Sequence, residues 1–165
     1  MTDQLAESGT SIQPLLVVRD AAAAIEFYVS VFGATQVWRV MHYHRIGHAV
    51  LRIGTSEFAI LDEFPEAGIT GPQTSETEIT KPLGARLMLQ VPDVDAVLHN
   101  ALAAGAALVR PVADQWWGVR SGTIRDPFGY QWSVHSIVEQ ISIEEMQRRA
   151  DTLGLYPPPV TSSVT

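Results

Sequence analysis

Apolar and polar positions along the first part of the chain change from a strand pattern to a helical one. An apolar run at 15–18 meets Asp20, a typical helix N-cap, and Gly33 stands where a helix end favours a left-handed residue. The stretch between them, 21–32, has apolar residues at helical spacing, namely Ile25, Tyr28, Val29 and Phe32. The pattern predicts a strand followed by a capped helix with one buried stripe.

The same unit occurs a second time. A strand pattern at 86–91 meets Asp93, and a helical stretch at 94–104 ends before Gly105. A shift of 73 residues lays Asp20 on Asp93 and also aligns the last strands of the two copies. Three strands follow each helix, at 35–44, 48–53 and 57–61, and at 107–112, 118–125 and 130–135. We therefore expect an α+β fold of two tandem βαβββ modules that form a curved, cup-like sheet.

The pattern also predicts how the chain is divided. The segment between the modules is rich in Pro, Gly, Thr and Glu and has no periodicity. Ser142 and Glu145 form a capping box for one more helix, which ends at Gly154. We expect a flexible N-terminus at 1–11, a first module at 12–63, a linker loop at 64–83, a second module at 84–138, a C-terminal helix at 139–154 and a disordered tail at 155–165.

Composition and charge narrow the classes of function. The 165 residues are 46% hydrophobic and 18% charged, which is typical of a globular domain. The absence of cysteine excludes disulfides and thiolate metal sites, and with no visible secretory signal it favours a cytoplasmic protein. The net charge is −7 and Lys81 is the only lysine, so we expect neither nucleic acid nor a membrane surface as a partner.

The last strand of the second module separates two kinds of side chain. Asp126-Pro127-Phe128-Gly129 predicts a tight turn before it. One face of the strand then carries Gln131, Ser133 and His135, and the other carries Tyr130, Trp132 and Val134. Trp132 therefore fits the core, and the polar face raises the question of what it binds.

These features carry a family resemblance over residues 12–149. The paired βαβββ repeat, the FY within the first helix, the FGA after it and the DPFG before the last strand resemble the vicinal oxygen chelate superfamily. This group contains glyoxalases, extradiol dioxygenases, and bleomycin- and fosfomycin-resistance proteins. The string WWGVRSGTIRDPFGYQWSVHS, followed by an SxEEM helix, is most similar to the PhnB-like branch. The resemblance implies a homodimer.

The resemblance also implies where metal ligands would lie. In the metalloenzymes of this superfamily, each module supplies ligands from its first and last strands. The corresponding positions here are Gln13, Ile60, Arg86 and Ser133. Ile60 has no lone pair and Arg86 is a permanent cation, so this set does not suit a metal ion. A register slip of two would recruit Asp62 or His135 but leave Arg86 in place. We therefore expect no metal and no cofactor.

Without a metal, the same positions predict a ligand cavity. Arg86 among neutral hydrogen-bonding groups suits a ligand with a carboxylate, phenolate or carbonyl group. Alternatively, Arg86 pairs with an internal acid such as Asp62. The tryptophans at 38 and 116 could supply aromatic walls. The predicted ligand-binding residues are Gln13, Trp38, His42, Phe58, Ile60, Arg86, Met88, Trp116, Gln131 and Ser133.

The histidines of the HYHRIGH stretch offer an alternative metal site. His42 and His44 share one strand face, and His48 opens the next strand. No carboxylate accompanies them nearby in the sequence, and histidines at hairpin ends are mostly solvated. The interpretation that we favour gives His42 a place in the cavity as a hydrogen-bonding group or a weak base.

Three functions fit these observations. The favoured one is metal-independent binding of a small molecule, such as an antibiotic or an aromatic metabolite, because sequestration needs only a complementary pocket. The alternative is a lyase, isomerase or cyclase acting on a small organic substrate, with or without a divalent metal. Its catalytic candidates are Arg86, to stabilise negative charge, and His42 or His135, as acid–base groups. A third possibility assigns the C-terminal helix and the acidic surface to a protein partner.

Overall fold

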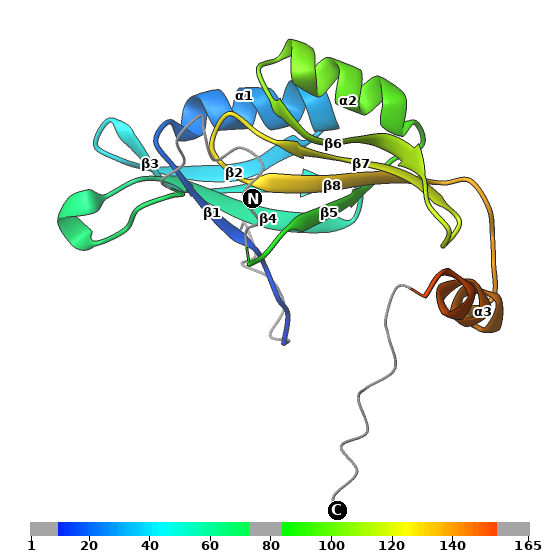
Figure 1. The fold of residues 1–165 in the computed structure, drawn as a ribbon. Coiled ribbons are helices and arrows are strands. Elements are labelled where there is room, and N and C mark those ends of the chain that lie inside the picture. Colours follow the sequence, from blue (N-terminus) through cyan, green and yellow to red (C-terminus); the bar gives the residue numbers. More distant parts are fainter. Residues whose placement is uncertain (1–9, 73–83, 155–165) are drawn as a thin grey trace, which may run out of the picture. The chain divides into compact units, whose positions relative to one another are not determined.

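The computed structural model describes residues 10–72 and 84–154 and divides into two compact units (Figure 1). The first unit holds the described residues up to 72 together with the turn at 127–129, and the second holds the remaining described residues. Three predicted segments lie wholly or partly outside the described residues. They are the tail at 155–165, most of the flexible N-terminus at 1–11, and residues 73–83 of the linker.

The first unit is one βαβββ module. Its elements are β1 (Leu15–Val18), α1 (Ala21–Phe32), β2 (Thr35–His42), β3 (Arg45–Ile53) and β4 (Ser56–Asp62). The strands form a sheet in the order β1-β4-β3-β2, in which β1 runs parallel to β4 and the other neighbours are antiparallel. Figure 1 shows α1 lying across one face of this sheet.

The second unit repeats this topology. Its elements are β5 (Leu87–Gln90), α2 (Val94–Ala103), β6 (Ala107–Asp114), β7 (Val119–Arg125) and β8 (Gln131–Ile137), with the strand order β5-β8-β7-β6. Here β5 runs parallel to β8. A further helix, α3 (Ile143–Leu153), follows β8. The prediction of an α+β fold with two tandem βαβββ modules and a C-terminal helix is confirmed.

Local sequence signals set the ends of the first helix. The Asp20 side chain accepts a hydrogen bond from the backbone N of Ala23 at 2.9 Å, and Gly33 has a left-handed φ of 67°. The helix buries Ala21, Ala24, Ile25, Phe27, Tyr28, Val31 and Phe32. Val29 is 43% exposed, so the predicted stripe was wrong at that position. The buried face of the helix turns toward Phe27 and Val31 instead.

The two faces of the first sheet follow from contacts with α1. The Phe58 ring meets the Tyr28 ring edge-on at 5.5 Å, and Asp62 accepts a hydrogen bond from the backbone N of Ala21. Because alternate residues of a strand share a face, Phe58, Ile60 and Asp62 point toward α1. Ala59 and Leu61 therefore lie on the opposite face.

The second sheet is arranged in the same way around α2. The Ser136 hydroxyl accepts a hydrogen bond from the backbone N of Val94 at 2.9 Å, so Trp132, Val134 and Ser136 share the α2 face. The indole Nε1–H of Trp132 donates to buried Asp126 at 2.8 Å. Gln131, Ser133 and His135 lie on the face opposite α2, which is the separation of side chains that the sequence predicted.

The shift of 73 residues does not hold through the last strands. Arg52 pairs with Glu57 across β3 and β4, whereas Arg125 pairs with Gln131 across β7 and β8. Four residues separate the first pair and five separate the second, so β4 and β8 correspond at a shift of 74. Ser133 is therefore equivalent to Ala59 and not to Ile60. A slip of one residue exchanges the two faces of a strand, so Ile60 and Ser133 do not occupy equivalent positions.

The C-terminal helix has the predicted cap. The Ser142 hydroxyl accepts a hydrogen bond from the backbone N of Glu145 at 3.1 Å, and Gly154 has a φ of 59°. Arg149 connects the helix to the rest of its unit, because it donates to the carboxylate of Glu139 and to the backbone oxygen of Trp116. No residue of α3 is buried. None of the helices in the described part of the chain is long and apolar enough to cross a bilayer.

The first part of the predicted linker is regular structure. The backbones of Phe64 and Ile69 exchange two hydrogen bonds, at 2.8 and 3.1 Å, around a short 3-10 turn at Pro65–Ala67. Gly68 closes the turn with a φ of 73°. This turn, residues 64–69, follows β4 directly and contributes to the site described next.

Candidate functional site

A groove opens on the first unit beside β2 and β3. Its volume is about 520 Å³, within the range of roughly 300–1,000 Å³ that is usual for small-molecule pockets. The lining residues come from β2, from β3 and from the turn at 64–69, and they are Trp38, Val40, Met41, His42, Gly47, His48, Phe64, Ala67 and Ile69.

Trp38 and His48 form an aromatic stack that lines the groove. Their rings stack with centroids 5.2 Å apart and an angle of 19° between the planes. Trp38 pairs with Val50 across β2 and β3, and Val50 pairs with Ala59, so the indole lies on the face opposite α1. Both rings are half-buried. An aromatic stack therefore forms part of the groove lining.

Phe64 forms a second aromatic wall. Its ring meets His42 nearly edge-on, with centroids 5.6 Å apart. The guanidinium carbon of Arg45 lies 4.1 Å from the centre of the Phe64 ring, which is a cation–π contact. Arg45 also donates a hydrogen bond to the backbone oxygen of Glu63 at 2.9 Å and pairs with the carboxylate of Glu66. Arg45 therefore fixes the position of this wall.

The charges around the groove are unevenly distributed. Of the described residues that line it, none is acidic, and two carry imidazole rings. The nearby carboxylate of Glu66 is paired with Arg45, whose hydrogen bond holds the pKa of Glu66 below its ordinary value. The charge of His42 acts on that pKa in the same direction. The groove therefore combines apolar and aromatic surface with two imidazole rings.

Two of the predicted ligand-binding residues, Trp38 and His42, line this groove. Sequence reasoning missed Phe64, Ala67 and Ile69, because they fall in the segment assigned to the linker. The sequence did hold a signal for them. Two apolar residues, Phe64 and Ile69, flank the string Pro-Glu-Ala-Gly, which is typical of a turn, and their backbones pair in the structure.

The histidines of the HYHRIGH stretch separate. His42 and His48 line the groove, whereas His44 lies exposed in the turn between β2 and β3. Throughout residues 10–72 and 84–154, no group of three or more His, Cys, Asp or Glu side chains is placed to hold a metal ion. The His42 ring contacts the rings of Tyr43 and Phe64, and the His48 ring stacks on Trp38.

Phe58 and Ile60 lie in the core and not in the groove. Phe58 is 6% exposed beneath Tyr28, and Ile60 is fully buried. Both point toward α1 because they have the same parity along β4 as Asp62. Neither side chain lines the groove.

The second unit presents a polar row on the face opposite α2. Ser133 pairs with Met88 of β5 and with Thr123 of β7, and His135 lies opposite Ser121. The imidazole Nδ1 of His135 is buried and has no hydrogen-bond partner among the described residues. Met88 is 74% exposed. Gln131 belongs to the same face and is buried.

The remaining predicted residues lie near the ends of strands. Gln13 and Arg86 are exposed and precede β1 and β5, and Arg86 forms no ion pair with a described residue. Asp62, the partner considered for Arg86, accepts hydrogen bonds from backbone N–H groups of the first unit. Trp116 lies in the turn between β6 and β7, with its ring 5.1 Å from that of Trp117.

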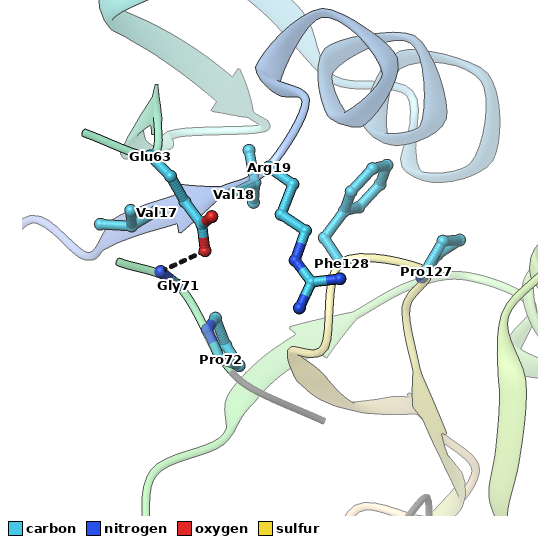
Figure 2. Close-up of a pocket in the computed structure, with 8 residues that line it drawn as sticks. All are labelled: Val17, Val18, Arg19, Glu63, Gly71, Pro72, Pro127 and Phe128. Carbon is cyan, nitrogen blue, oxygen red and sulfur yellow. Dashed lines mark hydrogen bonds between the residues drawn. The ribbon is translucent and has the colours of Figure 1, made fainter. Parts of the chain in front are cut away.

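A smaller cavity of about 100 Å³ lies near the end of β1 (Figure 2). Its lining residues are Val17, Val18, Arg19, Glu63, Gly71, Pro72, Pro127 and Phe128. Figure 2 shows the Glu63 carboxylate pointing to Gly71, whose backbone N donates to it at 2.8 Å. A Cβ atom at Gly71 would lie 2.2 Å from the backbone oxygen of Val17, so the two segments are in close contact. This cavity is too small for a drug-sized ligand.

Comparisons with known proteins agree with the architecture. An uncharacterized protein of Mycobacterium bovis is 36% identical over 149 residues, which cover 87% of this chain and 94% of that protein. The crystal structure of TioX from Micromonospora sp. ML1 has a TM-score of 0.57 and 27% identity, over 78% of this chain and 99% of TioX. The PhnB protein from Bacillus cereus has the same fold, with a TM-score of 0.58 and 17% identity over 77% of this chain and 99% of its own.

The sequence of the chain also matches a protein-family model. It is described as the Glyoxalase/Bleomycin resistance protein/Dioxygenase superfamily, and it matches residues 10–134, which contain β1 of the first module and most of β8 of the second. The paired modules and this match lead to one conclusion: the chain belongs to the glyoxalase/bleomycin resistance protein/dioxygenase superfamily.

Proposed function

We propose that the protein binds a small, flat, aromatic molecule without a metal ion, and that the ligand lies in the groove against Trp38 and Phe64. An antibiotic or an aromatic metabolite has the required shape. The observation that carries the proposal is the Trp38–His48 stack, which faces a groove of about 520 Å³ with Phe64 on another wall.

Physical chemistry supports this assignment. Aromatic contacts contribute about 0.5–1.5 kcal/mol beyond the burial of their area, so a planar ligand gains most from such walls. A few polar groups in an otherwise apolar pocket fix the orientation of a ligand, and here His42 and His48 are such groups. Binding of this kind requires shape and stacking, and it does not need a metal ion to polarise oxygen atoms.

The proposal extends to the second unit and to the assembly. Within the second unit, Met88, Gln131 and Ser133 remain predicted ligand contacts, and His135 remains a predicted acid–base group on the face opposite α2. We include a homodimer in the proposal, as the family resemblance implies, and a cytoplasmic location, which the absence of cysteine favours. Light scattering on the purified protein tests the dimer.

Calorimetric titration with 1-naphthamide, a neutral flat probe, tests the proposed function. We expect saturable binding that EDTA leaves unchanged. Trp38→Ala should weaken it by about tenfold, since about 1.4 kcal/mol corresponds to a factor of ten. Trp117→Ala is the matched control, because Trp117 lies in the β6–β7 turn and does not line the groove. Equal binding by wild type and Trp38→Ala, or loss of binding in EDTA, would contradict the proposal.

A further inference from the structure

The groove has the chemistry of a site for an anion as well as for an aromatic ring. His42 comes from β2 and His48 from β3, and both reach the same groove. Nothing acidic lines it in the part of the chain that the structure describes. A ligand that carries a negative charge would therefore meet two imidazoles and no opposing carboxylate at the walls.

The charged groups around the groove support this selectivity. Arg45 covers Phe64, and the acidic group near His42 is Glu66, which Arg45 pairs with. Arg45 also lies opposite His42 across β2 and β3, and the ring centroid of Tyr43 lies 4.9 Å from that of His42. Glu63 turns its carboxylate to the backbone N of Gly71, in the smaller cavity. The carboxylates near the groove therefore have partners of their own.

The His48 ring lies against the Trp38 indole in the groove. A cation over the face of an indole is attracted by the negative charge of the ring face. The rings of Trp38 and His48 lie within the distance at which this attraction acts. Imidazole is also the side chain whose ordinary charge change falls between about pH 5 and 8.

We propose that the groove selects aromatic acids, that is, flat molecules with a carboxylate or similar anionic group, and that protonated His42 and His48 supply the counter-charge. This inference rests on the proposed function and names its class of ligand. Hydrogen bonds between charged partners are shorter and roughly twice as strong as neutral ones. Affinity for such a ligand therefore rises as the imidazoles gain protons, and it falls as they lose them.

Three probes with the same ring and different charge test this selectivity: 1-naphthoate, 1-naphthamide and 1-naphthylmethylammonium. Each is titrated by calorimetry at about pH 5.5 and about pH 8, on either side of the ordinary imidazole range. We expect naphthoate to bind about tenfold more tightly at the lower pH, as expected for a charged hydrogen bond. The amide should change by less than about twofold, and the ammonium probe should bind most weakly at the lower pH.

Substitutions assign the pH dependence to named residues. His42→Gln and His48→Gln retain a hydrogen-bonding side chain but cannot gain a proton. The double variant should bind naphthoate with the same affinity at both pH values. His44→Gln and His99→Gln are matched controls, because both residues are exposed and neither lines the groove. These controls should keep the full pH dependence of the wild type.

The outcomes separate this inference from the proposed function. If none of the three probes binds, the proposed function fails. If 1-naphthamide binds as tightly as naphthoate at both pH values, the function stands and the selectivity for acids is overturned. The same holds if His99→Gln removes the pH dependence as completely as the double variant does.

Discussion

Asp62, the last residue of β4, binds the first backbone N–H of α1: its Oδ1 lies 2.7 Å from the nitrogen of Ala21. The other carboxylate oxygen accepts from the backbone N of Ile46 at 2.6 Å. Asp20 already caps the helix through Ala23, so the two acids satisfy different N–H groups of the same helix end. In the second module, Ser136 takes the equivalent place, and its hydroxyl binds the backbone N of Val94.

We expect Asp62→Ala to destabilise the fold more than Ser136→Ala. The first substitution leaves two N–H groups without their charged acceptor, at a cost of about 1.5–3 kcal/mol or more. The second removes one neutral hydrogen bond, worth about 0.5–1.5 kcal/mol. Urea denaturation of the two variants measures the difference in the free energy of unfolding. Equal losses would show that Asp62 contributes no more than a neutral cap.

Gly122 lies where β7 meets α2, and we expect Gly122→Ala to be destabilising. A Cβ atom there would lie 2.4 Å from Cδ2 of buried Leu98 and 3.1 Å from Cγ2 of Val112. Overpacking of this kind costs about 1–3 kcal/mol. Gly84→Ala is the control, since a Cβ atom at Gly84 has no neighbour within 4 Å. Thermal unfolding compares the two, and combining Gly122→Ala with Leu98→Val should recover part of the loss.

Gly47 controls the space next to His42 in the groove. A Cβ atom at this position would lie 3.2 Å from Cβ of His42, which is closer than an ordinary contact. We expect Gly47→Ala to displace the imidazole and weaken naphthoate binding by about threefold to tenfold, the effect of a lost hydrogen bond of about 1 kcal/mol. Calorimetry gives the affinity. Unchanged affinity in this variant would indicate that His42 does not touch the ligand.

The ion pairs of α3 predict a change at acidic pH. Arg148 and Arg149 hold the pKa of Glu145 at about 2, below its usual 4.5. A lowered folded-state pKa means that the stabilising contribution is complete above about pH 4.5 and is lost as the pH falls toward about 2. We expect the difference in Tm between wild type and Glu145→Gln to fall to zero as the pH is lowered from about 4.5 to about 2. A difference that stays constant down to about pH 2 would contradict the assignment.

Most of the fold could be predicted because short-range chemistry determines it. Asp20, Asp93 and Ser142 each cap the helix that the sequence assigned to them. The register of the last strand could not be predicted from a fixed shift. The connection between β7 and β8 holds one more residue than the connection between β3 and β4, and only the pairing of Arg125 with Gln131 reveals it. Because of that one residue, the fixed shift aligned Ile60 with Ser133 and placed it in a cavity. In the structure, Ile60 lies in the core.

The candidate site was predictable only in part, for a different reason. Trp38 and His42 stand on one strand face, and alternation along a strand is visible in a sequence. Phe64 and Ile69 reach the groove through a turn whose ends pair with each other, and no periodicity shows such a contact. The stack of His48 on Trp38 depends on how β2 and β3 pair. The spacing of residues along one strand does not give the distance between side chains on neighbouring strands.

The extra residue between β7 and β8 also bears on how the two halves of the chain have been able to diverge. It lies at the tip of the hairpin, between Arg125 and Gln131. The side chains of β8 therefore alternate between the helix-facing side and the opposite side of the sheet as those of β4 do. The same insertion inside β8 would turn Trp132 and Val134 away from α2 and bring Ser133 under it. Hairpin tips are therefore the positions at which evolution can lengthen or shorten either half of this protein while its inner and outer surfaces keep their chemistry.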